Sequence, residues 1–125
     1  MDNVELHLNQ YKHNKNFISY GISNTKEKFC DWEVTVYFYA TIHLVEAVMC
    51  KKIENVEIKS HEDRRRLMYS HKETFGTSQN SYRMLYDLAR TARYNGITKI
   101  TDIDVYQAQS YFEDVEQKLL KYINS

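Results

Sequence analysis

The sequence has 125 residues, no proline, only 3 glycines and equal numbers of basic and acidic side chains, 17 of each. A chain of this length forms one domain and can close a hydrophobic core. The scarcity of helix-breaking residues favours long helices with short connections. A formal net charge of zero argues against nucleic-acid binding by bulk phosphate neutralisation, but it leaves room for a local basic site.

The hydropathy of the chain and its cysteines bear on its location. Residues 1–10 are polar and acidic and lack the apolar centre of a signal peptide. No stretch approaches the roughly 18 apolar residues of a membrane span. Cys30 and Cys50 lack the spacing of a zinc framework and would lie roughly 30 Å apart on one straight helix. We therefore expect a cytoplasmic protein with reduced thiols and no membrane partner.

Two helices are predicted in the N-terminal half. The first runs from about Asn3 to Tyr20, and Gly21 begins the joint that follows it. The second runs from about Asp31, a plausible N-cap, to Lys51. Its apolar residues cover most of its faces, which is typical of the buried helix of a bundle.

Three further helices are predicted in the second half, at about Ser60–Met68, Gln79–Tyr94 and Thr101–Ile123. The first and the last of them open with residue pairs typical of a capping box, namely Ser60 with Asp63 and Thr101 with Asp104. Asn95-Gly96 is typical of a helix C-cap.

The remaining connections are short, and residues 71–78 are interpreted as a loop. No repeat, low-complexity tract or interdomain linker interrupts the chain. The sequence thus predicts an all-α fold in which residues 1–125 form a single up-and-down helical bundle of about five helices.

One face of the second predicted helix is polar. Tyr39, His43, Glu46 and Cys50 follow one another at spacings of four, three and four residues, which places them on the same face. A buried polar ladder needs partners, so we expect a polar group opposite it. Two interpretations stay open: a satisfied core pair, or a pocket in which His43 is an acid–base or phosphate-binding group.

The fourth predicted helix carries arginines beside its apolar face. Arg93 lies at the edge of that face near Tyr82 and Tyr86, and Arg90 lies further round the same flank. Arginine grips phosphate bidentately, and arginine with tyrosine can hold a nucleotide or an RNA backbone. The alternative is a solvated basic face paired with acids. In the run Arg64–Arg66, Arg64 is the best candidate because it follows the predicted cap.

No segment has the ligand spacing of a good metal site. His61 and Asp63 form only a weak candidate pair, so we expect no metal and no cofactor. His7, His13 and His71 have no obvious partner in the sequence and are interpreted as surface residues.

Several short motifs together make the chain resemble the HEPN-like domain family, whose members are helical modules of bacteria and eukaryotes. The resemblance is carried by Asp31–Thr35 with Phe38–Ala47, by Ser60-His61-Glu62-x-Arg64, by Tyr82–Leu88, by Ala92-Arg93-Tyr94 and by a last helix that begins near Ile103. It covers nearly the whole chain in the order and spacing of the elements.

The resemblance implies a helical bundle that usually forms a homodimer. Many members are ribonucleases of toxin–antitoxin or phage-defence systems, often with a partner protein encoded nearby, and they use an arginine followed four to six residues later by a histidine. In this chain the residues four, five and six positions after Arg90 are Tyr94, Asn95 and Gly96, so the ribonuclease motif is absent. Members without the motif act as nucleotide-binding or partner-binding modules.

Three functions are therefore considered. The first is a nucleotide- or RNA-binding or regulatory module, with ligand-binding residues Tyr39, Arg64, Arg90, Tyr94 and Asn95. The second is a metal-independent ribonuclease in which His43 is the base, Arg93 stabilises the anion and Glu46 orients the imidazole. The third is a structural dimerisation protein without a ligand, whose polar ladder only fixes the packing of the core.

Overall fold

The computed structural model describes residues 3–21, 29–94 and 99–124, and these ranges contain helices and no strand. The elements in chain order are α1 (Asn3–Asn16), the π-helical segment η1 (Phe17–Gly21), α2 (Cys30–Lys52), α3 (His61–Ser70), α4 (Lys72–Phe75), α5 (Gln79–Tyr94) and α6 (Asp102–Ile123). The predicted all-α class is confirmed.

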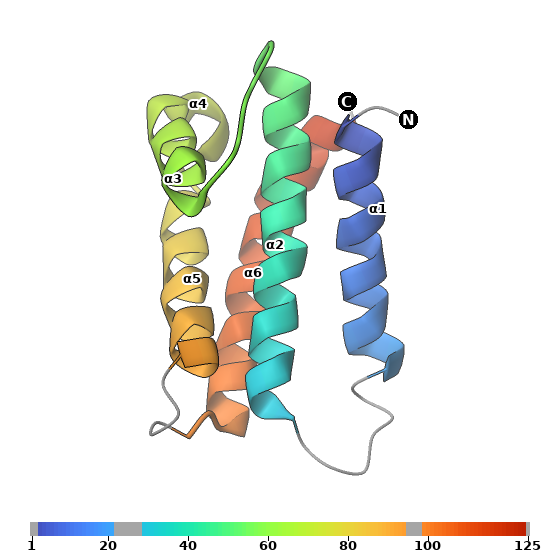
Figure 1. The fold of residues 1–125 in the computed structure, drawn as a ribbon, viewed down its shortest axis with the longest axis vertical. Coiled ribbons are helices and arrows are strands. Elements are labelled where there is room, and N and C mark those ends of the chain that lie inside the picture. Colours follow the sequence, from blue (N-terminus) through green and yellow to red (C-terminus); the bar gives the residue numbers. More distant parts are fainter. Residues whose placement is uncertain (1–2, 22–28, 95–98, 125) are drawn as a thin grey trace.

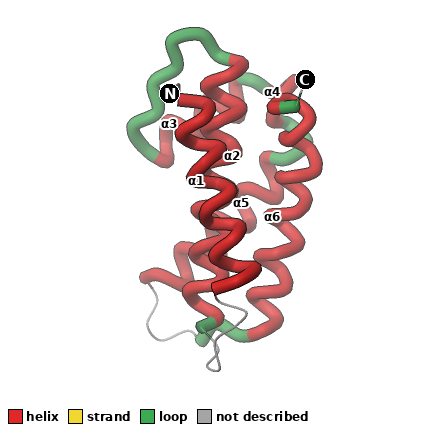
Figure 2. The backbone as a smooth tube through the Cα atoms, turned by 90° about the vertical axis from the view of Figure 1, so that its right-hand side faces the viewer, coloured by secondary structure: helices red, strands yellow, loops and turns green. Residues whose placement is uncertain are grey.

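Four long helices lie side by side along the length of the molecule, and the short helices α3 and α4 sit beside the start of α5 (Figures 1 and 2). In Figure 1 the chain descends α1, ascends α2, descends α5 and ascends α6, so that both termini lie at one end. Helix α2 packs against α1, α5 and α6 and is therefore the central element.

The core is built around α2, as its apolar sequence predicts. Its fully buried residues include Val34, Ala40, Leu44, Val45 and Val48. The other helices close the core with Met68, Phe75, Tyr82, Leu85, Ala89, Phe112, Val115 and Leu119. Burial of this apolar surface is the main favourable contribution to folding.

Helix α2 is also the one helix in the described residues that is long and apolar enough to cross a membrane by length and composition alone. Of its most apolar window, 67% is buried inside the bundle, and the core helix of a soluble protein passes the same test. The segment has no uninterrupted apolar run of membrane length, because His43 and Glu46 interrupt it, and it passes the test on its mean hydropathy.

Two predicted helix boundaries are wrong. Helix α2 begins at Cys30, and its N-cap position is Phe29, which makes no side-chain capping bond. Asp31 instead lies in the first turn, where a negative charge favours the positive end of the helix dipole. Residues 71–78, interpreted as a loop, contain the single turn α4, because this turn carries the Phe75 side chain into the core. The described residues thus hold six α-helices instead of about five.

Gly21, predicted to begin the joint after the first helix, is the last residue of η1, and the residues that follow it lie outside the described part of the structure. A Cβ atom at Gly21 would lie 2.9 Å from the ring of Phe17, so glycine permits this close approach. The predicted capping box of Thr101 and Asp104 is confirmed at the start of α6. At α3, Ser60 Oγ accepts from the Asp63 backbone N–H at 3.2 Å, while the Asp63 carboxylate accepts from the backbone of Lys59 at 2.9 Å.

Candidate functional site: an arginine pocket beside a histidine cluster

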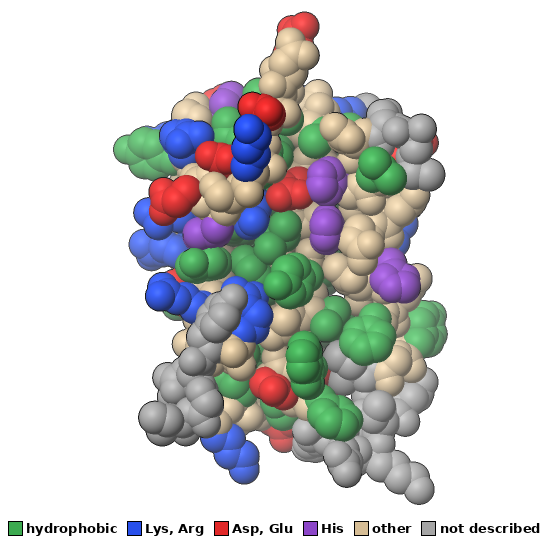
Figure 3. Space-filling model, viewed as in Figure 1, with side chains coloured by type: hydrophobic (Ala, Val, Ile, Leu, Met, Phe, Trp, Pro, Cys, Tyr) green, Lys and Arg blue, Asp and Glu red, His purple; other side chains and the backbone are tan. Residues whose placement is uncertain are grey.

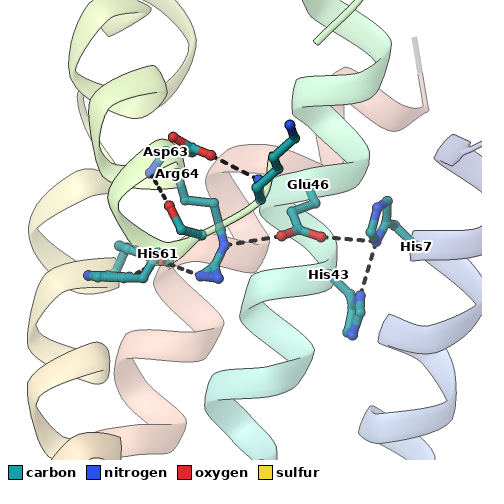
Figure 4. Close-up of polar contacts among 9 residues, drawn as sticks. His7, His43, Glu46, His61, Asp63 and Arg64 are labelled. Carbon is teal, nitrogen blue, oxygen red and sulfur yellow. Dashed lines mark hydrogen bonds and ion pairs between the residues drawn. The ribbon is translucent and has the colours of Figure 1, made fainter. Parts of the chain in front are cut away.

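The polar face of α2 is its least buried face in the middle of the helix. Tyr39 is 44% exposed, and His43, Glu46 and Cys50 are half-buried, whereas most of their neighbours are buried. Figure 4 shows that α1 and α3 bring side chains to this face from opposite sides. The expected polar partners are therefore present, and they are His7 on α1 and Arg64 on α3.

An ion pair between Arg64 and Glu46 joins α3 to α2. Arg64 Nε donates to Glu46 Oε1 at 3.1 Å, and each side chain is only 13% exposed. At this burial the two charges stabilise each other, because either one alone would lose its hydration without compensation. The pair fixes the guanidinium of Arg64 between α2 and α5.

A short chain of hydrogen bonds continues from Arg64 to α5 and back to α3. Arg64 donates a second bond to the hydroxyl of Tyr82, at 3.2 Å, and that hydroxyl lies 3.2 Å from His61 Nδ1. Because the Tyr82 oxygen accepts from Arg64, its own proton is available to His61 Nδ1. When Tyr82 donates this proton, neutral His61 carries its own proton on Nε2.

The ring of His61 stacks on Tyr86, with ring centroids 3.6 Å apart and ring planes 3° from parallel. Its Nε2 atom is buried and has no hydrogen-bond partner among the described residues. Burial, with the positive charges of Arg64 and Arg65, lowers the pKa of His61 below its ordinary value. His61 therefore offers a buried N–H donor that a ligand could satisfy.

A cavity of about 280 Å³ lies between α2, α3 and α5, and we call it the arginine pocket. Its lining residues are Phe38, Tyr39, Ile42, His61, Arg64, Tyr86, Arg90 and Arg93. Among the described residues, the lining contains three arginines and no carboxylate. The guanidinium of Arg93 lies 5.4 Å from the ring centroid of Phe38 and 5.7 Å from that of Tyr39, within the range of a cation–π contact.

Two more cavities flank the arginine pocket and share residues with it. One, of about 320 Å³, shares Tyr39 and Arg93 and extends to Trp32 on α2. The other, of about 490 Å³, shares His61 and Tyr86 and extends over α3 and α5. The three cavities adjoin in a row whose lining combines arginines and aromatic rings with two carboxylates, Asp31 and Asp87. Figure 3 shows lysine and arginine side chains gathered on the α3 and α5 side of this face.

The histidine cluster, which we define as His7, His43 and Glu46, lies on the other side of the Arg64–Glu46 pair. His7 Nδ1 is 3.0 Å from His43 Nδ1 and 3.2 Å from Glu46 Oε2. The two imidazole rings stack with centroids 5.3 Å apart. Burial, with the charges of His7 and Arg64, lowers the pKa of His43 to about 4.

The structure brings four of the sequence-predicted site residues together, because Tyr39, Arg64, Arg90 and Arg93 all line the arginine pocket. His43 does not line that pocket; it contacts His7 instead. The closest contacts of Glu46 are with Arg64 and His7. These contacts give no support to its expected role of orienting the imidazole of His43.

Two other predicted residues cannot be placed in the same way. The backbone of Tyr94 ends α5, but its side chain lies outside the described part of the structure. Asn95, and with it the predicted Asn95-Gly96 cap, also lies outside the described residues.

Sequence reasoning missed two residues of these sites, His7 and His61, and it also misjudged His71, which lies outside them. The interpretation of His7 as a surface residue without a partner is wrong, because it meets residues 36 positions away. His71 is also held, since its Nδ1 lies 2.9 Å from the Leu67 carbonyl oxygen. His61 was considered only as a weak metal ligand, although its position one turn before Arg64 places both on one face of α3.

No protein-family model matches this chain, and no curated protein matches it.

Proposed function

We propose that this chain is a HEPN-like nucleotide- or RNA-binding module and that the arginine pocket holds a phosphate group of its ligand. The observation that carries the proposal is the convergence of Arg64, Arg90 and Arg93 on one cavity whose described lining has no carboxylate. The resemblance of the sequence to HEPN-like domains supports the same function independently.

The three arginines differ in how firmly they are held. Arg64 is nearly buried and fixed by Glu46 and Tyr82, and Arg93 lies against two aromatic rings. Arg90 is exposed at the mouth of the cavity. Guanidinium groups bind phosphate oxygens bidentately, and those already held in place lose little conformational entropy on binding. In the proposal Arg64 and Arg93 bind the phosphate inside the pocket, and Arg90 binds it from the mouth of the cavity.

The volume and lining of the cavities indicate how much of a ligand each holds. Small-molecule pockets usually measure about 300–1,000 Å³, and the arginine pocket, at about 280 Å³, lies just below that range, so we expect it to hold a phosphate and part of its sugar rather than a whole nucleotide. The flanking cavities present aromatic rings, with Trp32 60% exposed and Tyr69 63% exposed. Bases stack on such rings with little sequence preference, so a mononucleotide or a short single strand fits the row.

The ribonuclease interpretation has less support. A general base must reach the 2′-hydroxyl of the same ligand whose phosphate the arginines hold. His43 lies with His7 beyond the Arg64–Glu46 pair, and the histidine of the arginine pocket is His61. His61 carries a buried N–H, which can bind a phosphate oxygen, so the proposal gives it a binding part.

Isothermal titration calorimetry with AMP, ATP and a short single-stranded RNA tests the proposal. We expect saturable binding of at least one of these ligands, weakened at least about tenfold by Arg93→Ala and less by Arg90→Ala, since each charge-assisted phosphate contact contributes about 1.5–3 kcal/mol. The matched control is Arg66→Ala, which removes an arginine that is 71% exposed and pairs with Asp63 on α3.

The same titration can contradict the proposal. If no ligand binds, or if Arg66→Ala and Arg93→Ala weaken binding equally, the pocket is not the binding site. Gel analysis of the RNA after the titration tests the ribonuclease alternative, which requires cleavage that His43→Ala abolishes. Light scattering tests the homodimer that the family resemblance implies, and a strict monomer at high concentration would count against it.

A further inference from the structure

We infer that His7, His43 and Glu46 form a binding site for a divalent transition-metal ion, for which Zn²⁺ is the reference ion. One donor atom from each of these side chains lies within 4.8 Å of the other two. This site is separate from the arginine pocket, and its existence does not depend on the proposed function. It differs from the expectation drawn from the sequence, in which no segment had metal-ligand spacing.

The distances between the donor atoms fit coordination of a single ion. Ligand atoms about 2.0–2.1 Å from a tetrahedral zinc ion lie about 3.3 Å from one another. Two separations in the cluster are 3.0 Å, between the Nδ1 atoms of His7 and His43, and 3.2 Å, between His7 Nδ1 and Glu46 Oε2, and the donor atoms of His43 and Glu46 lie within 4.8 Å of each other. The side chains therefore need only small movements to receive an ion.

Hydrogen bonding alone accounts for this arrangement poorly. Two imidazole Nδ1 atoms at 3.0 Å can share only one proton, because protonation of both would place two donors against each other. The same His7 Nδ1 also faces the Glu46 carboxylate, so one N–H would have to serve two acceptors. A metal ion accepts a lone pair from all three atoms at once.

The surroundings of the cluster are those of a metal site. Glu46 offers Oε2 to the cluster while Arg64 holds its Oε1, as outer-shell partners of metal-binding carboxylates do. The His7 side chain is 26% exposed, so an ion can enter from solvent and water can complete its coordination. Figure 4 shows the three side chains converging between α1 and α2 beside Arg64.

The donor set indicates which ions are suitable. Two imidazoles and one carboxylate suit zinc and its first-row neighbours and are too few and too soft for calcium. Three protein ligands leave at least one position open, as in zinc sites that bind a water or a small ligand. The inference therefore names a transition-metal ion with an exchangeable position.

Titration of untagged, chelator-treated protein with Zn²⁺ and with Co²⁺ tests the site. Calorimetry should give one zinc ion per chain, and Co²⁺ should develop the visible absorption of a low-coordinate site with nitrogen ligands. We expect His7→Ala to weaken zinc binding by more than the roughly 10–100-fold that loss of an outer-shell partner costs. His7 lies on an outer helix and is partly exposed, so this variant should keep its helical circular dichroism.

The matched control is His13→Ala, which removes an exposed histidine from the same helix and should leave zinc binding unchanged. If His43→Gln weakens zinc binding as much as His7→Ala does, His43 is the second ligand. The inference is overturned if the native chain binds neither ion, or if His7→Ala and His13→Ala bind zinc equally well.

Discussion

Arg64 Nε and Glu46 Oε1 lie 3.1 Å apart at the boundary between the arginine pocket and the histidine cluster. The guanidinium of Arg64 thus lines the arginine pocket on one side of the pair, and the carboxylate of Glu46 reaches the histidine cluster on the other. These two charges join α3 to α2 where the arginine pocket and the histidine cluster meet.

A double-mutant cycle on this pair should show strong coupling. Breaking a buried ion pair typically costs about 3–5 kcal/mol, and at 13% exposure we expect about 2–3 kcal/mol from either Glu46→Met or Arg64→Met. The double variant should be no less stable than either single one, because no unpaired charge stays behind. Urea denaturation measures the free energy of unfolding of the two single variants and the double variant. The control is Arg66→Met, at an exposed position, which should lie within about 0.5 kcal/mol of the native chain. Additive losses would contradict the coupling.

Stability should fall as the solution is acidified, and His61 should contribute to the fall. Its pKa in the folded chain is lower than its ordinary value of 6.5, so below about pH 6.5 the unfolded chain binds the proton first. The free energy of unfolding should therefore decrease from about pH 7 to about pH 5. Urea titrations in a chelating buffer should give a smaller decrease for His61→Asn, because only the shift of His43 then persists. If the free energy of unfolding depends on pH equally in the native chain and in His61→Asn, His61 titrates alike in the folded and unfolded states.

Salt should weaken RNA binding only moderately. Each phosphate neutralised on a single strand contributes about −0.7 to the slope of log K against log salt concentration, so three arginines predict a slope of about −2. Removing Arg90 should reduce the slope to about −1.4. Fluorescence anisotropy with a labelled oligoribonucleotide measures both. A slope beyond about −5 would instead indicate a broad basic surface, which the zero net charge of the chain argues against.

The capping box at the start of α6 should stabilise the fold measurably. Thr101→Ala removes the side-chain acceptor at the N-cap and should cost about 1 kcal/mol of unfolding free energy. Ser110→Ala, at an exposed position within the same helix, should change stability by less than about 0.5 kcal/mol. Thermal unfolding followed by circular dichroism compares the two, and equal effects would mean that the cap contributes nothing.

The helices could be predicted where local chemistry determines them. The central apolar helix and the Thr101–Asp104 cap depend on residues a few positions apart, and both are present in the structure. The turn at Lys72–Phe75 could not be predicted in this way, because it forms to bury Phe75 in a core contributed by distant segments.

The candidate sites show the same difference between features set by nearby residues and features set by distant ones. Arg90 and Arg93 lie three residues apart on one helix, so their shared flank follows from helix geometry. The contact of His7 with His43 spans 36 residues and depends on how α1 packs on α2, and no local pattern reports it. The tautomer of His61 likewise depends on Tyr82, which reaches it from a different helix.

The central claim, that a phosphate binds in the arginine pocket, is tested most directly by nuclear magnetic resonance of the arginine Nε–Hε groups. AMP would be titrated into labelled protein, with Arg64, Arg90, Arg93 and Arg66 assigned by substitution. We expect saturable shifts for the three pocket arginines, with one shared dissociation constant, and no saturable shift for Arg66. Equal, unsaturated shifts at all four arginines, or no shift at Arg93, would contradict this claim.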